Sequence, residues 1–147
     1  MNDDSWVAQG QKAHQGIEPI RFLIGSWRGE GWSQGSPVRG TLEVNAILDG
    51  TWIQATETLM DADGQNETVD LCFYRWDERS ESLQVFQLYE HAHLSTLLVE
   101  KTERGFRWIT GPMAPQLTFE KTDEGIRYHA SVEGESDPVT QMNYVPS

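Results

Sequence analysis

Turn-forming residues divide the chain, from Ser26 onward, into short apolar runs of about ten residues each. The runs alternate apolar and polar side chains and are rich in β-branched and aromatic residues, which is typical of half-buried strands. The breaks contain Gly, Pro, Asp and Asn, and Asp49-Gly50 is the strongest hairpin signal among them. The pattern predicts strands near residues 26–33, 38–47, 51–60, 67–76, 82–90, 92–101, 105–110, 115–121, 125–133 and 138–145.

Sequential short strands favour antiparallel pairing between chain neighbours, and a large sheet must close or stack to hide its edges. We therefore predict an all-β fold, an antiparallel up-and-down β-barrel of about ten strands, with a two-sheet sandwich as the alternative. Pro19 and Gly25 bound an apolar segment that predicts a short helix near 18–24, acting as a lid or plug. Residues 1–16 are polar and are expected to form an N-terminal arm, with a single barrel domain over 17–147.

The composition excludes several classes of partner. The chain has 11 Lys+Arg against 23 Asp+Glu, a formal net charge of -12. Few and scattered basic residues make nucleic acid and anionic membrane surfaces poor partners. The single cysteine, Cys72, cannot form an internal disulfide, and the N-terminus lacks the apolar run of a signal peptide. We expect a cytoplasmic protein with a small-molecule partner, and a homodimer is left open.

The strand faces suggest an enclosed cavity. Alternation places Trp27, Gly29 and Gly31 on one face, predicted to point inward, where the glycines either let the strand coil or leave space for a ligand. The strand near 67–76 is apolar on both faces, so either the helix or arm covers it outside or one face lines a cavity. A barrel of about ten strands is wider than side chains fill. The predicted ligand-binding residues are Trp27, Gly29, Gly31, Trp52, Gln54, Tyr74, Tyr89, Trp108 and Tyr128.

One segment carries a resemblance to a known family. Residues 22–31 (FLIGSWRGEG) place a short helix before a G-x-W-x-G-x-G strand, and ILDGTW at 47–52 and YRWD at 74–77 follow. On these motifs, over about 17–77, the chain resembles the calycin-like barrels, most closely the nitrobindin-like and fatty-acid-binding-protein-like ten-stranded group. The resemblance implies an internal cavity for a small molecule.

In nitrobindins, the resemblance further implies, the cavity binds haem through a histidine close to the chain end, and the haem supports nitric oxide binding and peroxynitrite isomerisation. The last predicted strand here, 138–145, has no histidine, so a haem cofactor lacks its expected ligand. Met142 is an iron ligand in principle, but a lone Met on a strand usually packs.

Three histidines are candidate catalytic groups. His91 and His93 occupy positions i and i+2 of a predicted strand and would share one face, and His129 lies on a later strand. The same pattern could hold a metal, but we expect partly exposed histidines and predict no metal site.

Strand carboxylates offer acid–base chemistry only where they are buried. These are Glu43, Glu57, Asp70 and Glu90, and the acidic composition favours an exposed face for them. Cys72 is expected to be a small buried apolar residue.

The preferred function is therefore binding of a hydrophobic or flat aromatic molecule inside the barrel. The first alternative is an enzyme that uses the same cavity, either a haem-dependent nitrobindin-like isomerase or a cofactor-free cyclase or isomerase. The second is an interaction module whose outer apolar face, including Trp32 and Trp76, docks a partner.

Overall fold

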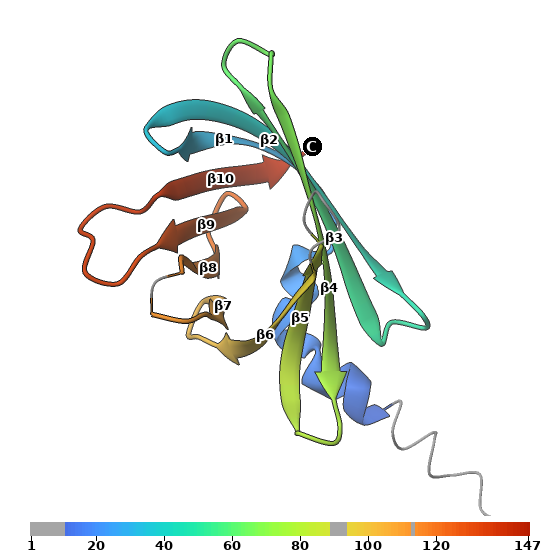
Figure 1. Ribbon diagram of the computed structural model, residues 1–147. Coiled ribbons are helices and arrows are strands. Elements are labelled where there is room, and N and C mark those ends of the chain that lie inside the picture. The colour runs from blue at the N-terminus through green and yellow to red at the C-terminus, as the bar shows by residue number, and fades with distance from the viewer. Residues whose placement is uncertain (1–10, 89–93, 113) are drawn as a thin grey trace, which may run out of the picture.

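The computed structural model describes residues 11–88, 94–112 and 114–147. Ten antiparallel strands form a closed barrel in which each strand pairs with its chain neighbours and β1 pairs with β10 (Figure 1). The predicted fold class is confirmed, and the architecture is consistent with a calycin-like barrel. The strands are β1 (Gly25–Ser33), β2 (Ser36–Ile47), β3 (Trp52–Asp61), β4 (Glu67–Asp77), β5 (Ser82–Leu88), β6 (Leu94–Lys101), β7 (Gly105–Ile109), β8 (Gln116–Lys121), β9 (Ile126–Ser131) and β10 (Thr140–Pro146).

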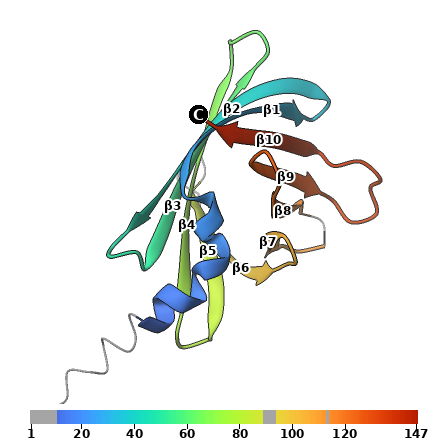
Figure 2. The same ribbon diagram turned by 180° about the vertical axis from the view of Figure 1, so that it is seen from behind.

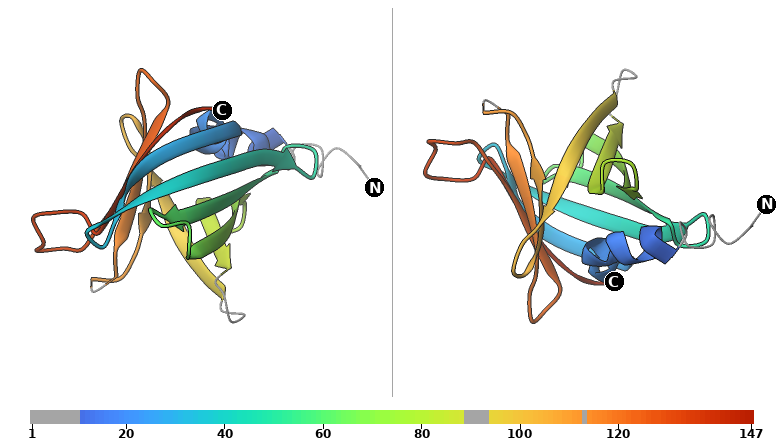
Figure 3. Two further views of the ribbon diagram at one scale, coloured as in Figure 1. Left: turned by 90° about the horizontal axis from the view of Figure 1, so that it is seen from above. Right: turned by 90° about the horizontal axis from the view of Figure 1, so that it is seen from below.

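The turns follow the chemistry of their residues. Between β2 and β3, the residues Leu48, Asp49 and Gly50 have φ angles of 49°, 59° and 76°, and the Gly50 amide donates to the carbonyl of Ile47 at 3.0 Å. Asp and Gly tolerate this left-handed region better than other residues, so Asp49-Gly50 makes the hairpin that the sequence predicts. The strands run around the barrel in chain order in the views of Figure 3.

A helical segment precedes β1 and packs against the barrel (Figure 2). Residues 11–16 are helical and lead into the 3₁₀ helix η1 (Glu18–Leu23), so the helical part extends into the predicted arm. Ile17, Ile20 and Leu23 are fully buried, and their spacing of three puts them on one side of a 3₁₀ helix. The indole of Trp27 donates to the Leu23 carbonyl at 2.7 Å, which fixes this plug to β1. None of the described helices is long and apolar enough to cross a membrane.

The glycines of β1 and β2 admit side chains from β10. Gly29 is paired with Gly40, and a Cβ atom on Gly29 would lie 2.3 Å from the Asn143 carbonyl oxygen and 2.7 Å from the Tyr144 ring. A Cβ on Gly31 would lie 2.8 Å from the sulfur of Met142, which is fully buried. The space above these glycines is therefore filled by β10, and the prediction that Gly29 and Gly31 leave room for a ligand is wrong.

Replacing Gly29 tests this packing. We expect Gly29→Ala to lower the free energy of unfolding by about 1–3 kcal/mol, because the new methyl group overlaps the backbone of β10. Gly111→Ala is the matched control, since nothing lies within 4 Å of its added Cβ, and its effect should stay below about 0.5 kcal/mol. Urea unfolding followed by Trp fluorescence measures both, and equal midpoints for the two variants would contradict the packing described.

Candidate functional site

A cavity of about 470 Å³ lies inside the barrel. Leu23 of the plug lies at its inner end, and Ser33, Gln34, Pro115 and Val139 line it near the β1–β2, β7–β8 and β9–β10 turns. These turns are at the barrel end away from the plug, so the cavity extends to that end. A larger groove of about 870 Å³ lies between η1 and the turns after β6 and β8, but it is a surface groove lined mainly by charged and polar side chains. The interior cavity is the better enclosed site.

One wall of the cavity is aromatic. It is formed by Trp108 of β7, Phe119 of β8 and Tyr128 of β9, with Tyr74 of β4 beside them. The rings of Phe119 and Tyr128 have their centroids 5.0 Å apart. The indole of Trp108 donates to the Tyr74 hydroxyl at 3.1 Å. Rings that pack on one another in this way keep their orientation and present a fixed apolar surface to the cavity.

The facing wall is polar and is formed by three adjacent strands. Glu57 of β3 and Asp70 of β4 are direct cross-strand partners, and Gln87 of β5 lies next to Cys72 of β4. All four line the cavity. The expectation that Glu57 and Asp70 lie on an exposed face is wrong, because they share the parity of buried residues on their own strands: Ile53 and Ala55 on β3, Cys72 and Tyr74 on β4. The sequence shows the alternation along each strand, but the burial of these neighbours decides which face points inward.

Glu57 is held by two tyrosines from the other side of the barrel. The Tyr128 hydroxyl donates to one carboxylate oxygen at 2.8 Å, and the Tyr144 hydroxyl donates to the other at 2.5 Å. Tyr144 reaches β3 because β2 has no side chain in its path: a Cβ on Gly40 would lie 2.5 Å from the Tyr144 hydroxyl oxygen. The glycines of β1 and β2 therefore place the hydroxyl that binds Glu57.

Burial controls the protonation of this site. The pKa of Glu57 is raised to about 7, mainly by burial; the hydrogen bonds from Tyr144 and Tyr128 lower it, and the charge of Asp70 adds a smaller rise. Burial and the nearby Glu57 charge raise the pKa of Tyr128 and of Tyr144, so both remain hydrogen-bond donors. Burial also raises the pKa of the Cys72 thiol, which makes it a poor nucleophile. The group that can exchange a proton near neutral pH is Glu57.

Some of the predicted ligand-binding residues line the cavity and others lie elsewhere. Tyr74, Trp108 and Tyr128 line the cavity. Trp27, Gly29 and Gly31 lie on the inner face but do not line the cavity. The indole of Trp27 donates a hydrogen bond to the plug, and β10 packs closely on the two glycines. Tyr89 lies outside the described residues.

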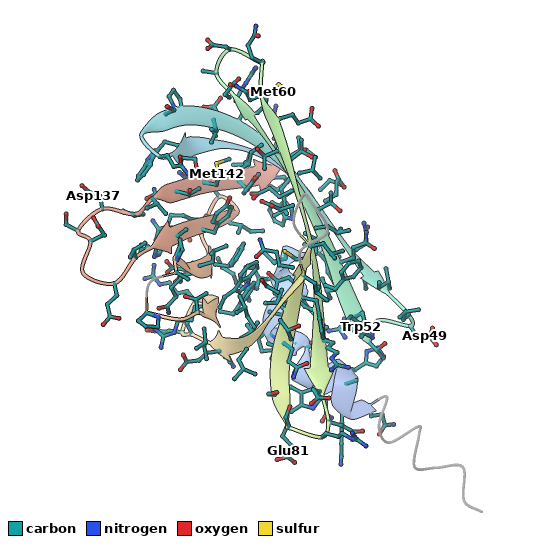
Figure 4. All side chains as sticks on the ribbon, viewed as in Figure 1. Asp49, Trp52, Met60, Glu81, Asp137 and Met142 are labelled. Carbon is teal, nitrogen blue, oxygen red and sulfur yellow. The ribbon has the colours of Figure 1, made fainter. Side chains whose placement is uncertain are left out.

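Trp52 and Gln54 were predicted to line the interior, and that placement is wrong. The buried residues of β3 near them are Ile53 and Ala55, so Trp52 and Gln54 have outward parity. Trp52 (labelled in Figure 4) packs on Phe86 with centroids 5.8 Å apart, and the Arg75 guanidinium lies 5.5 Å from its ring. This cluster covers the outside of β3, β4 and β5.

The structure describes one of the three predicted catalytic histidines. His129 lies between the buried residues Tyr128 and Ala130 of β9, so it points out of the barrel and is corrected to an outer-face residue. His91 and His93 lie outside the described residues. Trp76 was predicted, with Trp32, to lie on an outer docking face, but it has the inward parity of the buried residues Cys72 and Tyr74. It packs on the helical segment, since a Cβ on Gly16 would lie 2.2 Å from its ring. It is therefore not part of an open docking face.

The described thiol, phenol and thioether groups near the cavity are not placed as haem ligands. The Cys72 thiol stays protonated, the Tyr74 hydroxyl accepts from Trp108, and the Tyr128 hydroxyl donates to Glu57. Met142 is buried over Gly31 and does not line the cavity. In the part of the chain that the structure describes, no group of three or more His, Cys, Asp or Glu side chains could hold a metal ion.

Comparison with known proteins adds no family assignment. No protein-family model matches the chain, and no curated protein matches it significantly. We therefore infer the chemical role of the cavity from the residues that line it.

The raised pKa of Glu57 predicts a pH-dependent stability. Because the folded state keeps this proton up to about pH 7 while the ordinary pKa is 4.5, the protein loses stability as pH rises between these values. The loss attributable to Glu57 should reach about 3 kcal/mol above pH 7, at about 1.4 kcal/mol per pKa unit. Glu57→Gln should abolish this component in urea unfolding measured from pH 4 to pH 8.

Glu67→Gln is the control for net charge, because Glu67 is an exposed carboxylate on β4. It replaces a carboxyl group by an amide as Glu57→Gln does, but at a solvated position, so it shows how far a change in general repulsion among the acidic residues alters the pH dependence. Parallel stability curves for wild type and Glu57→Gln would show that Glu57 does not titrate as described.

Proposed function

We propose that the barrel binds a small, flat organic molecule in its interior cavity. The observation that carries this proposal is the cavity itself, about 470 Å³ between a wall of aromatic rings and a wall of polar side chains. A volume of this size lies within the range of about 300–1,000 Å³ usual for ligand pockets. The aromatic wall supplies apolar contact area, and Glu57, Asp70 and Gln87 supply a few oriented polar groups.

The two walls have separate roles in this mechanism. A flat ligand lies against Trp108 and Tyr128, where burial of its apolar area drives binding. Its polar edge faces Glu57 and Gln87, which select the orientation by hydrogen bonding. The plug closes the inner end through Leu23, so the ligand enters from the end where β1 and β2 are joined.

Acid–base catalysis is a second candidate function, and Glu57 is the residue that favours it. Its pKa of about 7 is close to the value that serves a general acid or base at neutral pH. Two tyrosine donors hold the carboxyl in place, as a proton-transfer group requires. This form of the enzyme hypothesis is a cofactor-free isomerase or cyclase, and neither the histidines nor haem takes part in it.

A cavity-filling variant tests the binding function. Ala130 lines the cavity on β9, and its neighbour His129 faces outward, so Ala130→Phe and His129→Phe add bulk on opposite sides of one strand. We expect Nile red, a neutral flat dye, to bind wild type with a rise in dye fluorescence. Ala130→Phe should weaken this binding by about tenfold or more, a loss of about 1.4 kcal/mol, while His129→Phe changes it by less than about twofold.

Two outcomes would count against the proposal: no binding of the dye by wild type, or equal binding by the two variants. Native mass spectrometry of the purified protein supplies an independent measurement, since it detects any copurified small molecule. Loss of that molecule in Ala130→Phe, but not in His129→Phe, would place it in the cavity.

A further inference from the structure

We infer that the ligand of the interior cavity carries a positively charged amine, and that Glu57 is the group that recognises it. This inference rests on the proposed binding function and adds the chemical class of the ligand. It depends on three observations: the free acceptor directions at Glu57, the sign of the charges along the cavity, and the aromatic wall of the same cavity.

The carboxylate of Glu57 is positioned but not saturated by its tyrosines. Each of its two oxygens accepts one hydrogen bond, from Tyr128 and from Tyr144 respectively. A carboxylate oxygen has two acceptor directions, so among the described residues each oxygen retains one. Glu57 also lines the cavity, so a ligand can reach it. An ammonium group, which has several N–H donors and no acceptor, fits these directions and forms short charge-assisted hydrogen bonds.

The charged groups that line the cavity are acidic. Glu57 and Asp70 are neighbours on β3 and β4, and no Lys, Arg or His is among the described residues that line the cavity. The Asp70 charge raises the pKa of Glu57, as the smallest of the four effects on that carboxyl group. A ligand cation beside Glu57 would relieve this repulsion, whereas a ligand carboxylate would increase it.

The aromatic wall suits the same ligand. Trp108, Phe119 and Tyr128 line the same cavity as the carboxylates, and Tyr128 contacts Glu57 through its hydroxyl. A cation placed between a carboxylate and aromatic faces is attracted by both. A neutral molecule would gain only the apolar contact with these rings, so the cavity should prefer the charged form.

The preference should depend on pH in a defined direction. The described titratable groups that interact with Glu57 are Asp70, Cys72 and Tyr74 of β4, Tyr128 of β9 and Tyr144 of β10. The tyrosines and the thiol keep their protons near neutral pH, because burial raises the pKa of each. The charge of Glu57 therefore changes near pH 7, and a permanently or stably charged ligand should bind more tightly at pH 8 than at pH 6.

Three probes that share a naphthalene ring system and differ in charge test the inference. Calorimetric titration of the full chain with 1-naphthylmethylamine, 1-naphthalenemethanol and 1-naphthoic acid compares a cation, a neutral molecule and an anion. We expect the amine to bind at least about tenfold more tightly than the alcohol at pH 8, and the acid to bind more weakly than the alcohol. Glu57→Gln should bring the amine to within about twofold of the alcohol, while Glu67→Gln, on the exposed part of β4, keeps the preference.

Equal or tighter binding of the alcohol or the acid by wild type would overturn the inference, as would an amine preference that survives Glu57→Gln. The wild-type comparison needs no variant, so a misfolded Glu57→Gln would not leave the inference undecided. Binding of none of the three probes also overturns it, and the Nile red titration then shows separately whether the cavity binds a neutral molecule. Failure of the charge preference and failure of cavity binding are thus distinguishable.

Discussion

The hydrogen bonds from Tyr128 and Tyr144 to Glu57 join β9 and β10 to β3 across the inside of the barrel. An ionised carboxylate inside a protein costs free energy unless partners compensate for the lost water, and here each oxygen has a tyrosine donor. The contact requires Tyr144 to pass over β1 and β2, which is possible because Gly29 and Gly40 have no side chain there. The glycine pair, the buried tyrosines and the acidic cavity are therefore parts of one arrangement.

The barrel has a packed end next to the plug and a hollow end that contains the cavity. Towards the plug, Ile17 and Ile20 are fully buried, and the rings of Phe106 and Phe119 stack with centroids 4.9 Å apart. Beyond this packed layer, small residues such as Ala55 and Ala130 line the wall and leave the cavity open. Dense packing at one end stabilises the fold, so the other end can remain hollow for a ligand.

The acidic composition has two different consequences. Exposed carboxylates such as Glu43 and Glu67 lie on the outer surface, where water solvates them. Glu57 and Asp70 face the cavity, where each charge acts on the other through an environment with little water. Net charge, counted over the chain, does not distinguish these cases, although the proposed recognition of a cation depends on the interior pair.

The sequence by itself determined the all-β fold, the ten strands and the Asp49-Gly50 hairpin, because alternation and turn chemistry are local properties of neighbouring residues. It also identified Tyr74, Trp108 and Tyr128 as inward-facing rings. It did not determine which face of β3 points inward, since Trp52 and Gln54 on one face are as plausible as Glu57 on the other until Ile53 and Ala55 are seen to be buried. Only the tertiary structure brought Glu57 to the tyrosines of β9 and β10, because that contact joins residues 71 and 87 positions apart and depends on glycines of two further strands.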